Sequence, residues 1–219
     1  MPELRILRRS VAFGYHDSNF VTVRESLTDH LPVSQRSGFR ERLWRVRARQ
    51  VVLATGAHER PMVFGNNDLP GVMLSSAMAD YAELYGVRIG QQIVIATTGD
   101  SAYDDARLLT AAGAKVTVVD SRSGALQGGS RAHRAQGDGI TVLRGFVPVL
   151  AKGSASVSAL VVRQMDGDKA SAETRELPCD AVGMAGGWNP AIHLYSHSGG
   201  KALWDQGLVC FKPGVVMPN

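Results

Sequence analysis

Residues 93–120, IVIATTGDSAYDDARLLTAAGAKVTVVD, decide the fold of this 219-residue chain. The stretch opens and closes with short apolar runs rich in Val and Ile, which favour buried strands. Between them Ala102, Ala106, Leu109 and Ala112 recur at nearly helical spacing, and Gly113 is placed to end that helix. The order strand, helix, strand predicts a right-handed parallel βαβ unit.

The turn after the first of these strands is a degenerate form of the dinucleotide-binding signature GxGxxG. Such a turn lets the backbone approach a pyrophosphate, which the amino end of the next helix then binds. Thr97, Gly99 and Ala102 stand at the three signature positions, and Asp100 would repel a phosphate. Asp120 follows about twenty residues on, where an acid meets the ribose of NAD. We predict that these five residues bind a cofactor, with a vestigial or purely structural Rossmann unit as the alternative.

The region before this unit is predicted to be an antiparallel meander followed by a tight turn. Extended segments are expected at residues 4–7, 20–24 and 41–47. A run at 51–54, VVLA, is apolar enough for a buried strand, and the small residues Thr55 and Gly56 after it allow a sharp turn. A linker then leads to a short helix that Ser75 or Ser76 can cap and that Gly86 ends.

The region after residue 120 is predicted to contain a surface loop and several short strands. Residues 122–138 lack a core pattern and are interpreted as a surface loop that could include a short helix, with a mobile lid as the functional alternative. ITVLRG, VPVLAKG, VSALVVRQMDG and TRELPCD are strand-like segments separated by turns. Near the end, Asn189 is expected to cap a short helix that begins at Pro190. Tyr103, Asp104 and Asp105 are interpreted as the solvated side of the helix in the βαβ unit.

Composition narrows the function classes. The formal charge is +4 and the pI about 9.3, but the arginines between residues 36 and 49 alternate with apolar residues, which indicates the wet face of a strand rather than a nucleic-acid surface. Cys179 and Cys210 match no metal spacing, so we expect no metal site and reduced thiols. Without an apolar run of about 18 residues or a signal peptide, the expectation is a cytoplasmic protein that does not bind membranes.

Four segments resemble one known family, the alpha subunit of heterotetrameric sarcosine oxidase, within the flavoproteins that bind two dinucleotides. They are FGYHDSN, RLWRVRARQVVLATGAHERPMVFGNNDLPGVML, IVIATTGDSAYDDA and CDAVGMAGGWNPAIHLYSHSGGK, in the family's order. The resemblance implies an α/β fold: a Rossmann-like NAD(P)-binding domain with a parallel sheet and a β-meander, inserted in an incomplete FAD/NAD(P)-binding domain. It places residues 1–60 and 189–219 in the interrupted first domain and 61–188 in the inserted one.

The same resemblance implies a role in oxidative demethylation of sarcosine, with NAD on the alpha subunit and FAD and FMN in the full complex with a beta subunit. It places Thr55 and Gly56 near the nucleotide of the first domain and Gly186 near that of the second. No residue is predicted to be catalytic. Opine oxidase, D-hydroxyproline dehydrogenase and hydrogen cyanide synthase subunits share much of the scaffold, and a non-catalytic interaction module is a further alternative.

Two further expectations follow from the resemblance. The chain contains no CxxC motif, which argues against disulfide reduction. The family's amino-terminal GxGxxG strand and closing segment are not found, so we expect a fragment that is inactive alone and binds NAD weakly or not at all. Apolar surface should then be exposed on the first domain, which a homodimer could cover.

Overall fold

The computed structural model describes residues 4–123, 129–167 and 169–214. The elements in the first half are β1 (Ser10–His16), β2 (Phe20–Ser26), η1 (Val33–Gln35), β3 (Glu41–Arg47), β4 (Ala57–Glu59), β5 (Val72–Leu74), α1 (Ser75–Tyr85), β6 (Gln92–Thr97) and α2 (Ser101–Ala111). Those in the second half are β7 (Lys115–Asp120), α3 (Gly129–Gly137), β8 (Thr141–Arg144), β9 (Phe146–Gly153), β10 (Val157–Asp166), β11 (Lys169–Pro178), β12 (Ala181–Ala185), β13 (Trp188–Pro190), α4 (His193–His197), β14 (Ala202–Asp205) and β15 (Cys210–Pro213).

The chain divides into two compact units. Unit 1 comprises residues 1–58 and 189–219, and unit 2 comprises residues 59–188. Strand β4 pairs with β13 where the chain passes between the units. The assignment of unit 1 to an interrupted nucleotide-binding domain stays a prediction.

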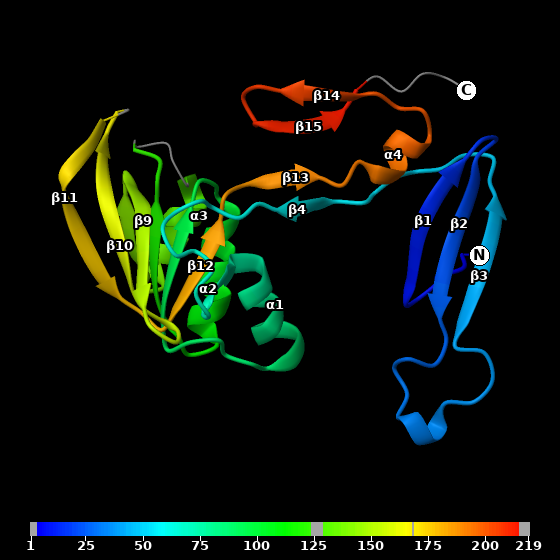
Figure 1. Ribbon diagram of the computed structural model, residues 1–219, viewed down its shortest axis with the longest axis horizontal. Coiled ribbons are helices and arrows are strands. Elements are labelled where there is room, and N and C mark those ends of the chain that lie inside the picture. Colours follow the sequence, from blue (N-terminus) through cyan, green and yellow to red (C-terminus); the bar gives the residue numbers. More distant parts are fainter. Residues whose placement is uncertain (1–3, 124–128, 168, 215–219) are drawn as a thin grey trace. The chain divides into compact units, whose positions relative to one another are not determined.

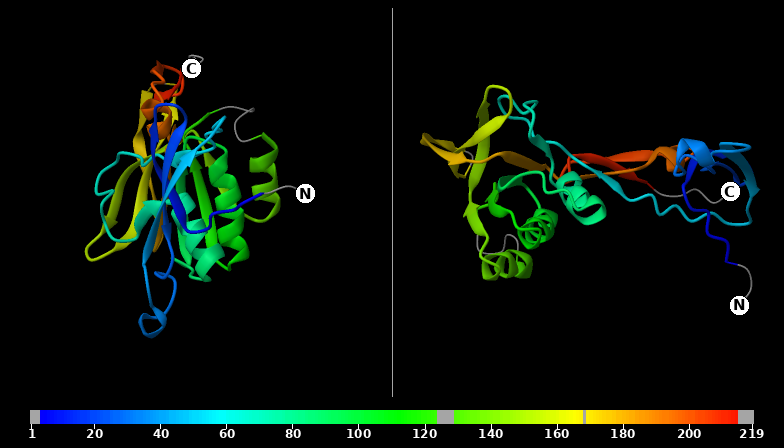
Figure 2. Two further views of the ribbon diagram at one scale, coloured as in Figure 1. Left: turned by 90° about the vertical axis from the view of Figure 1, so that its right-hand side faces the viewer. Right: turned by 90° about the horizontal axis from the view of Figure 1, so that it is seen from below.

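Unit 2 is a three-layer α/β structure around the predicted βαβ unit. Its parallel sheet has the order β5-β12-β6-β7-β8, with β6 and β7 in register from the Gln92–Lys115 pair to the Thr97–Asp120 pair. Helices α1, α2 and α3 cover one face, and the antiparallel sheet β11-β10-β9 covers the other (Figures 1 and 2). The predicted α/β fold with a parallel sheet and a β-meander is confirmed.

Alternation along β6 explains why both faces of the parallel sheet are covered. Ile93 and Ile95 pack into the core on the helical side, whereas Val94 packs into the core against the antiparallel sheet. All three side chains are almost completely buried, as in other parallel sheets with two covered faces. Ala102, Ala106 and Leu109 of the predicted apolar stripe are buried in the helical-side core. Ala112, also predicted in the stripe, is exposed, because α2 ends at Ala111 and Ala112 is its C-cap. Gly113 adopts a left-handed φ of 88° after that helix.

Unit 1 contains the three-stranded antiparallel sheet β1-β2-β3 and the hairpin β14-β15. The strands predicted at residues 20–24 and 41–47 are confirmed as β2 and β3, paired from Phe20–Arg47 to Ser26–Glu41. The predicted strand at residues 4–7 is wrong: the first strand is β1, which begins at Ser10. Arg9 has a left-handed φ of 52° and turns the backbone just before β1, and Leu4 and Ile6 are exposed.

The predicted buried strand at residues 51–54 is also wrong. The segment has no strand pairing, and Val52 is 88% exposed. An apolar run becomes a buried strand only where neighbouring strands pair with it, and the described residues supply none here.

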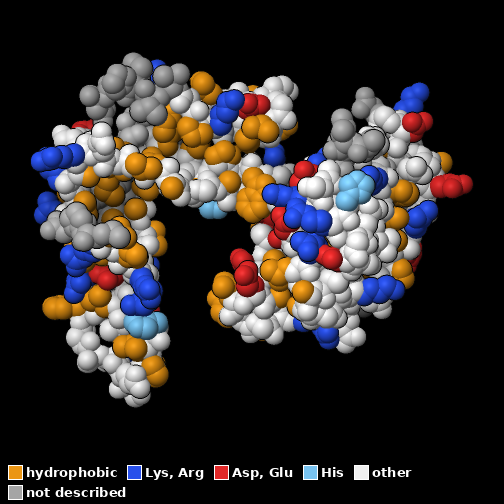
Figure 3. Space-filling model, turned by 180° about the vertical axis from the view of Figure 1, so that it is seen from behind, with side chains coloured by type: hydrophobic (Ala, Val, Ile, Leu, Met, Phe, Trp, Pro, Cys, Tyr) orange, Lys and Arg blue, Asp and Glu red, His pale blue; other side chains and the backbone are white. Residues whose placement is uncertain are grey.

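The expected exposure of apolar surface on unit 1 is seen in Figure 3, where hydrophobic side chains lie between those of Lys and Arg.

Two predicted helix starts are displaced. Helix α1 has Leu74 as its N-cap, and Ser75 and Ser76 are its first two residues rather than its caps. Asn189 and Pro190 lie in strand β13, and α4 begins only at His193. Residues 122–138, predicted as a surface loop that could include a short helix, contain the short helix α3, and residues 124–128 lie outside the described part of the chain. None of the described helices is long and apolar enough to cross a membrane.

Candidate functional site

The turn between β6 and α2 is filled by the side chain of its own first residue. Thr97 is completely buried, and its hydroxyl oxygen accepts a hydrogen bond from the Gly99 N–H at 2.9 Å. The same oxygen lies 2.9 Å from the Gly99 carbonyl oxygen and 3.2 Å from that of Ala185. The threonine therefore uses the Gly99 N–H that a glycine at this position would leave free for a phosphate.

Asp120, at the end of β7, is also completely buried, and both of its carboxylate oxygens have donors. The Tyr103 hydroxyl donates to Oδ2 at 2.7 Å. Arg122 donates to Oδ1 from its backbone N–H at 3.0 Å and from Nε at 2.9 Å, and to Oδ2 from Nη2 at 2.8 Å. A carboxylate accepts about four hydrogen bonds, so this one has little capacity left for a ribose diol.

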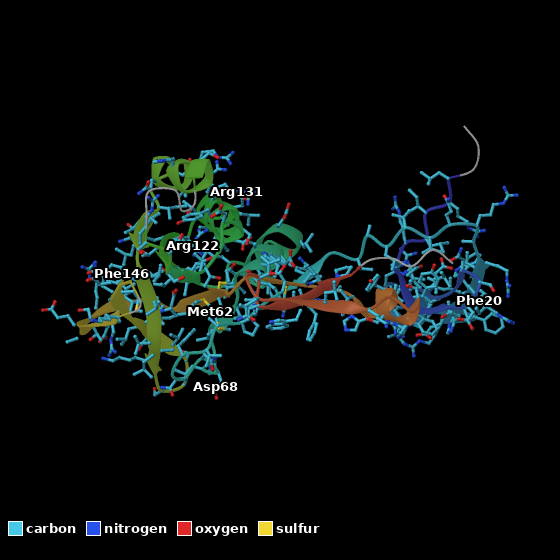
Figure 4. All side chains as sticks on the ribbon, turned by 90° about the horizontal axis from the view of Figure 1, so that it is seen from above. Phe20, Met62, Asp68, Arg122, Arg131 and Phe146 are labelled. Carbon is cyan, nitrogen blue, oxygen red and sulfur yellow. The ribbon has the colours of Figure 1, made fainter. Side chains whose placement is uncertain are left out.

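Arg122, labelled in Figure 4, also contacts a residue of the turn. Its Nη2 also lies 2.7 Å from Oδ1 of Asp100, the residue before α2. Burial alone would raise the pKa of Asp120, but the hydrogen bonds from Arg122 and Tyr103 hold it below the ordinary value. The hydrogen bond to Asp120 raises the pKa of Arg122, so the two groups are a stable ion pair at neutral pH.

The remaining predicted residues of unit 2 are fixed by packing. Ala102 is completely buried in the first turn of α2, and the indole N–H of Trp188 donates to the neighbouring Ser101 hydroxyl at 3.0 Å. Gly186 donates its N–H to the Arg60 carbonyl oxygen at 2.8 Å, and a Cβ at Gly186 would lie 2.8 Å from that same oxygen. A glycine is required there for close approach of two backbone segments.

The predicted turn of unit 1 has different surroundings. The Thr55 hydroxyl donates to the Ala191 carbonyl oxygen at 2.7 Å, and the Ala191 N–H donates to the Gly56 carbonyl oxygen at 3.0 Å. Gly56 has a left-handed φ of 67°, and no atom lies within 4 Å of the position that a Cβ would take. Both residues are exposed. Here the backbone is fixed while the space beside it is open.

A cleft of about 530 Å³ lies beside this turn, within unit 1. Thr55 and Gly56 line it together with apolar residues of segment 51–54, and Tyr15 and Tyr195 supply aromatic side chains. Clefts that bind small molecules and cofactors are typically of this size and mostly apolar. Unit 1 also carries twelve Lys and Arg residues against six Asp and Glu, a formal charge of +6, which suits an anionic ligand.

The structure thus separates the eight predicted residues into two groups. Thr97, Gly99, Asp100 and Ala102 lie in or beside one turn of unit 2, with Asp120 connected to it through Arg122 and Gly186 on the segment after β12. Thr55 and Gly56 lie in unit 1. Within the described residues, no group of three His, Cys, Asp or Glu side chains could hold a metal ion.

The sequence interpretation missed two sets of polar contacts in unit 2, one at Tyr103 and one at Asp105. Tyr103, predicted to be solvated, is completely buried, and Asp105 contacts the buried Ser75 hydroxyl, which also contacts Glu59. Only Asp104 of the predicted solvated group is exposed, in an ion pair with Arg131. The pairing of Asp120 with Arg122 could have been predicted from the sequence. An arginine two residues after an acid at the end of a strand can fold back and donate to it.

Comparison with known proteins adds sequence relatives. The sequence model of the pyridine nucleotide-disulphide oxidoreductase family matches residues 16–212. Sarcosine oxidase subunit alpha from Corynebacterium sp. (strain P-1) is 43% identical over 216 residues, which cover 97% of this chain and 22% of that protein. The corresponding subunit from Rhizobium meliloti (strain 1021) is 39% identical over 219 residues, covering 96% and 20%. The chain therefore spans about a fifth of the length of these relatives.

Solved structures agree with the fold. Thioredoxin reductase from Lactococcus lactis aligns with a TM-score of 0.58 and 20% identity, covering 84% of this chain and 55% of that one. L-proline dehydrogenase from P. horikoshii aligns with a TM-score of 0.57 and 20% identity, covering 94% and 32%. At this identity the likeness concerns the fold alone.

Proposed function

Because the chain belongs to the pyridine nucleotide-disulphide oxidoreductase family, we propose that it is the nucleotide-binding region of a sarcosine oxidase-like alpha subunit. In this proposal it supports flavin-dependent oxidative demethylation of sarcosine in a multi-subunit enzyme with a beta subunit. The homology to sarcosine oxidase alpha subunits over nearly the whole chain supports the assignment. The chain supplies no catalytic residue, and oxidation takes place at a flavin held elsewhere in the complex.

The proposed dinucleotide site is the cleft of unit 1 beside Thr55 and Gly56. The single observation that carries this choice is the state of Asp120, the acid predicted to bind the ribose in unit 2. Its side chain is buried, and its carboxylate already accepts hydrogen bonds from Arg122 and Tyr103. NAD bound against Gly56 would meet open space and a positively charged unit. When bound, NAD supplies a nicotinamide ring that can accept or donate a hydride, and the residues of this chain would only bind and orient it.

The turn at Thr97–Gly99 is proposed to be a structural remnant of a Rossmann site. The Thr97 side chain fills the turn, and Asp100 places a carboxylate near the amino end of α2. Arg122 pairs with both Asp100 and Asp120. A dinucleotide would have to displace Arg122 from a buried ion pair, at a cost of a few kcal/mol. These residues fit a cofactor poorly, which favours the scaffold alternative for this unit.

Calorimetric titration of the chain with NAD, with NADP and FAD as controls, tests the proposal. Gly56→Ala should weaken NAD binding, because its Cβ would enter the open space beside the turn. Gly99→Ala is the matched control, since a Cβ there also meets no atom within 4 Å. Thr97→Gly should leave the affinity unchanged. Tighter binding by Thr97→Gly would contradict the proposal and identify the unit 2 turn as the weakened site.

A further inference from the structure

A buried hydroxyl in unit 2 bridges two carboxyl groups. Ser75 is completely buried, and its Oγ lies 2.5 Å from Oδ2 of Asp105 and 3.2 Å from Oε1 of Glu59. The other oxygen of Glu59 accepts hydrogen bonds from the Ser76 N–H at 2.9 Å and from the Ser76 hydroxyl at 2.7 Å. Three elements meet at this cluster: β4 through Glu59, α1 through the serines, and α2 through Asp105.

The number of protons available determines the charge of this cluster. A serine hydroxyl donates one hydrogen bond only, so Ser75 satisfies one of the two carboxyl groups. The second contact requires a proton on a carboxyl group. Glu59 is the better anion, because it accepts two bonds from Ser76 at the positive amino end of α1. The proton therefore belongs on Asp105, which donates to Ser75, which in turn donates to Glu59.

The charged groups around Asp105 favour the same assignment. Glu59 faces it from β4, Asp80 from α1 and Asp104 from α2, and all three are acidic. Burial is the largest cause that raises the pKa of Asp105, to about 6, and these acids add to the effect, whereas the hydrogen bond with Ser75 opposes it. Loss of the proton would leave two carboxylates sharing one hydroxyl, and their repulsion would weaken the contact between Glu59 and α1.

We propose that Asp105, Ser75 and Glu59 form a proton-dependent clamp that fastens the first residue of unit 2 to helices α1 and α2. Glu59 is the residue at which the chain enters unit 2 from β4, so the clamp controls the attachment of the connecting strand. Protonation of Asp105 closes the clamp, and ionisation loosens it.

Hydrogen exchange of the full chain tests this proposal between about pH 5 and about pH 7.5. The readout is protection of the Ser76 amide, whose acceptor is Glu59, after correction for its intrinsic exchange rate. Protection should fall about tenfold with rising pH in the wild type. It should stay level in Asp105→Asn, whose amide donates to Ser75 at every pH. The control Glu83→Gln, which neutralises an exposed acid of α1 other than the three that face Asp105, should keep the wild-type fall.

An equal fall in Asp105→Asn, or level protection in the wild type, would overturn the proposal. A second measurement on the unmutated chain does not depend on any variant folding. Carbon-13 titration of the Asp105 carboxyl should give a midpoint near 6, and a midpoint near the ordinary value of 3.8 would overturn the clamp.

Discussion

The turn at Thr55–Gly56 in unit 1 and the turn at Thr97–Gly99 in unit 2 both carry a threonine and a glycine, yet their surroundings are opposite. In unit 1 the threonine hydroxyl bonds across to Ala191, Gly56 requires its left-handed φ, and the space beside it is open. In unit 2 the Thr97 hydroxyl accepts a hydrogen bond from Gly99 within its own turn, and Asp120, the acid predicted to bind a ribose, is paired with Arg122. Similar sequence motifs can therefore have open space beside them in one place and packed side chains in another.

Removal of Asp120 is the largest effect that this comparison predicts. Asp120→Ala would leave the Tyr103 hydroxyl and the Arg122 Nε without their acceptor, with only Asp100 still paired to the guanidinium, and should lower the free energy of unfolding by about 3–5 kcal/mol. Urea denaturation followed by circular dichroism measures it. The matched control is Asp104→Ala, which breaks an exposed ion pair with Arg131 and should cost less than about 1 kcal/mol. Equal losses in the two variants would show that the Asp120 network does not hold unit 2 together.

Acid should remove part of the same stabilisation. Because the folded-state pKa of Asp120 lies below its ordinary value of 3.8, its contribution is complete above that value and is lost as the pH falls through the lower, folded-state pKa. Asp105 acts in the opposite direction: its raised pKa means that stability is lost as the pH rises from about 4 to about 6. Denaturation at a series of pH values measures the free energy of unfolding. Asp120→Ala should abolish its decrease at acid pH, and Asp105→Asn should abolish its decrease between about pH 4 and about pH 6. Unchanged slopes would refute these assignments.

Gly56→Ala should have a moderate effect on stability. A side chain at a left-handed φ of 67° costs about 1 kcal/mol, although no neighbouring atom obstructs it. Thermal unfolding of unit 1 measures the loss. A variant as stable as the wild type would mean that the turn relaxes and that its backbone is not fixed.

Gly99→Ala should have the smallest effect. The backbone of Gly99 does not adopt a left-handed φ, and a Cβ there meets no atom within 4 Å, so the free energy of unfolding should change by less than about 0.5 kcal/mol. The measurement is the same urea denaturation. A large loss would reveal a constraint on this glycine that the structure does not contain.

The sequence predicted those parts of the molecule whose structure depends on local pattern. The βαβ unit was predicted well because the apolar runs of β6 and β7 and the apolar spacing of α2 are properties of neighbouring residues. The run at 51–54 was mispredicted because burial of a strand depends on its pairing partners. The cluster at Ser75 could not be predicted, since Glu59 and Asp105 lie 16 and 30 residues away and meet only through the packing of α1 on α2.

Amide chemical shifts recorded during titration of the isotope-labelled chain with NAD test the central claim most directly, because they locate binding on one turn or the other. Shift changes are expected to centre on Thr55, Gly56 and Ala191 in unit 1, with Gly99 and Ala102 unaffected. Shift changes centred on Gly99, Ala102 and Arg122 would contradict this claim and show that NAD displaces the arginine from Asp120.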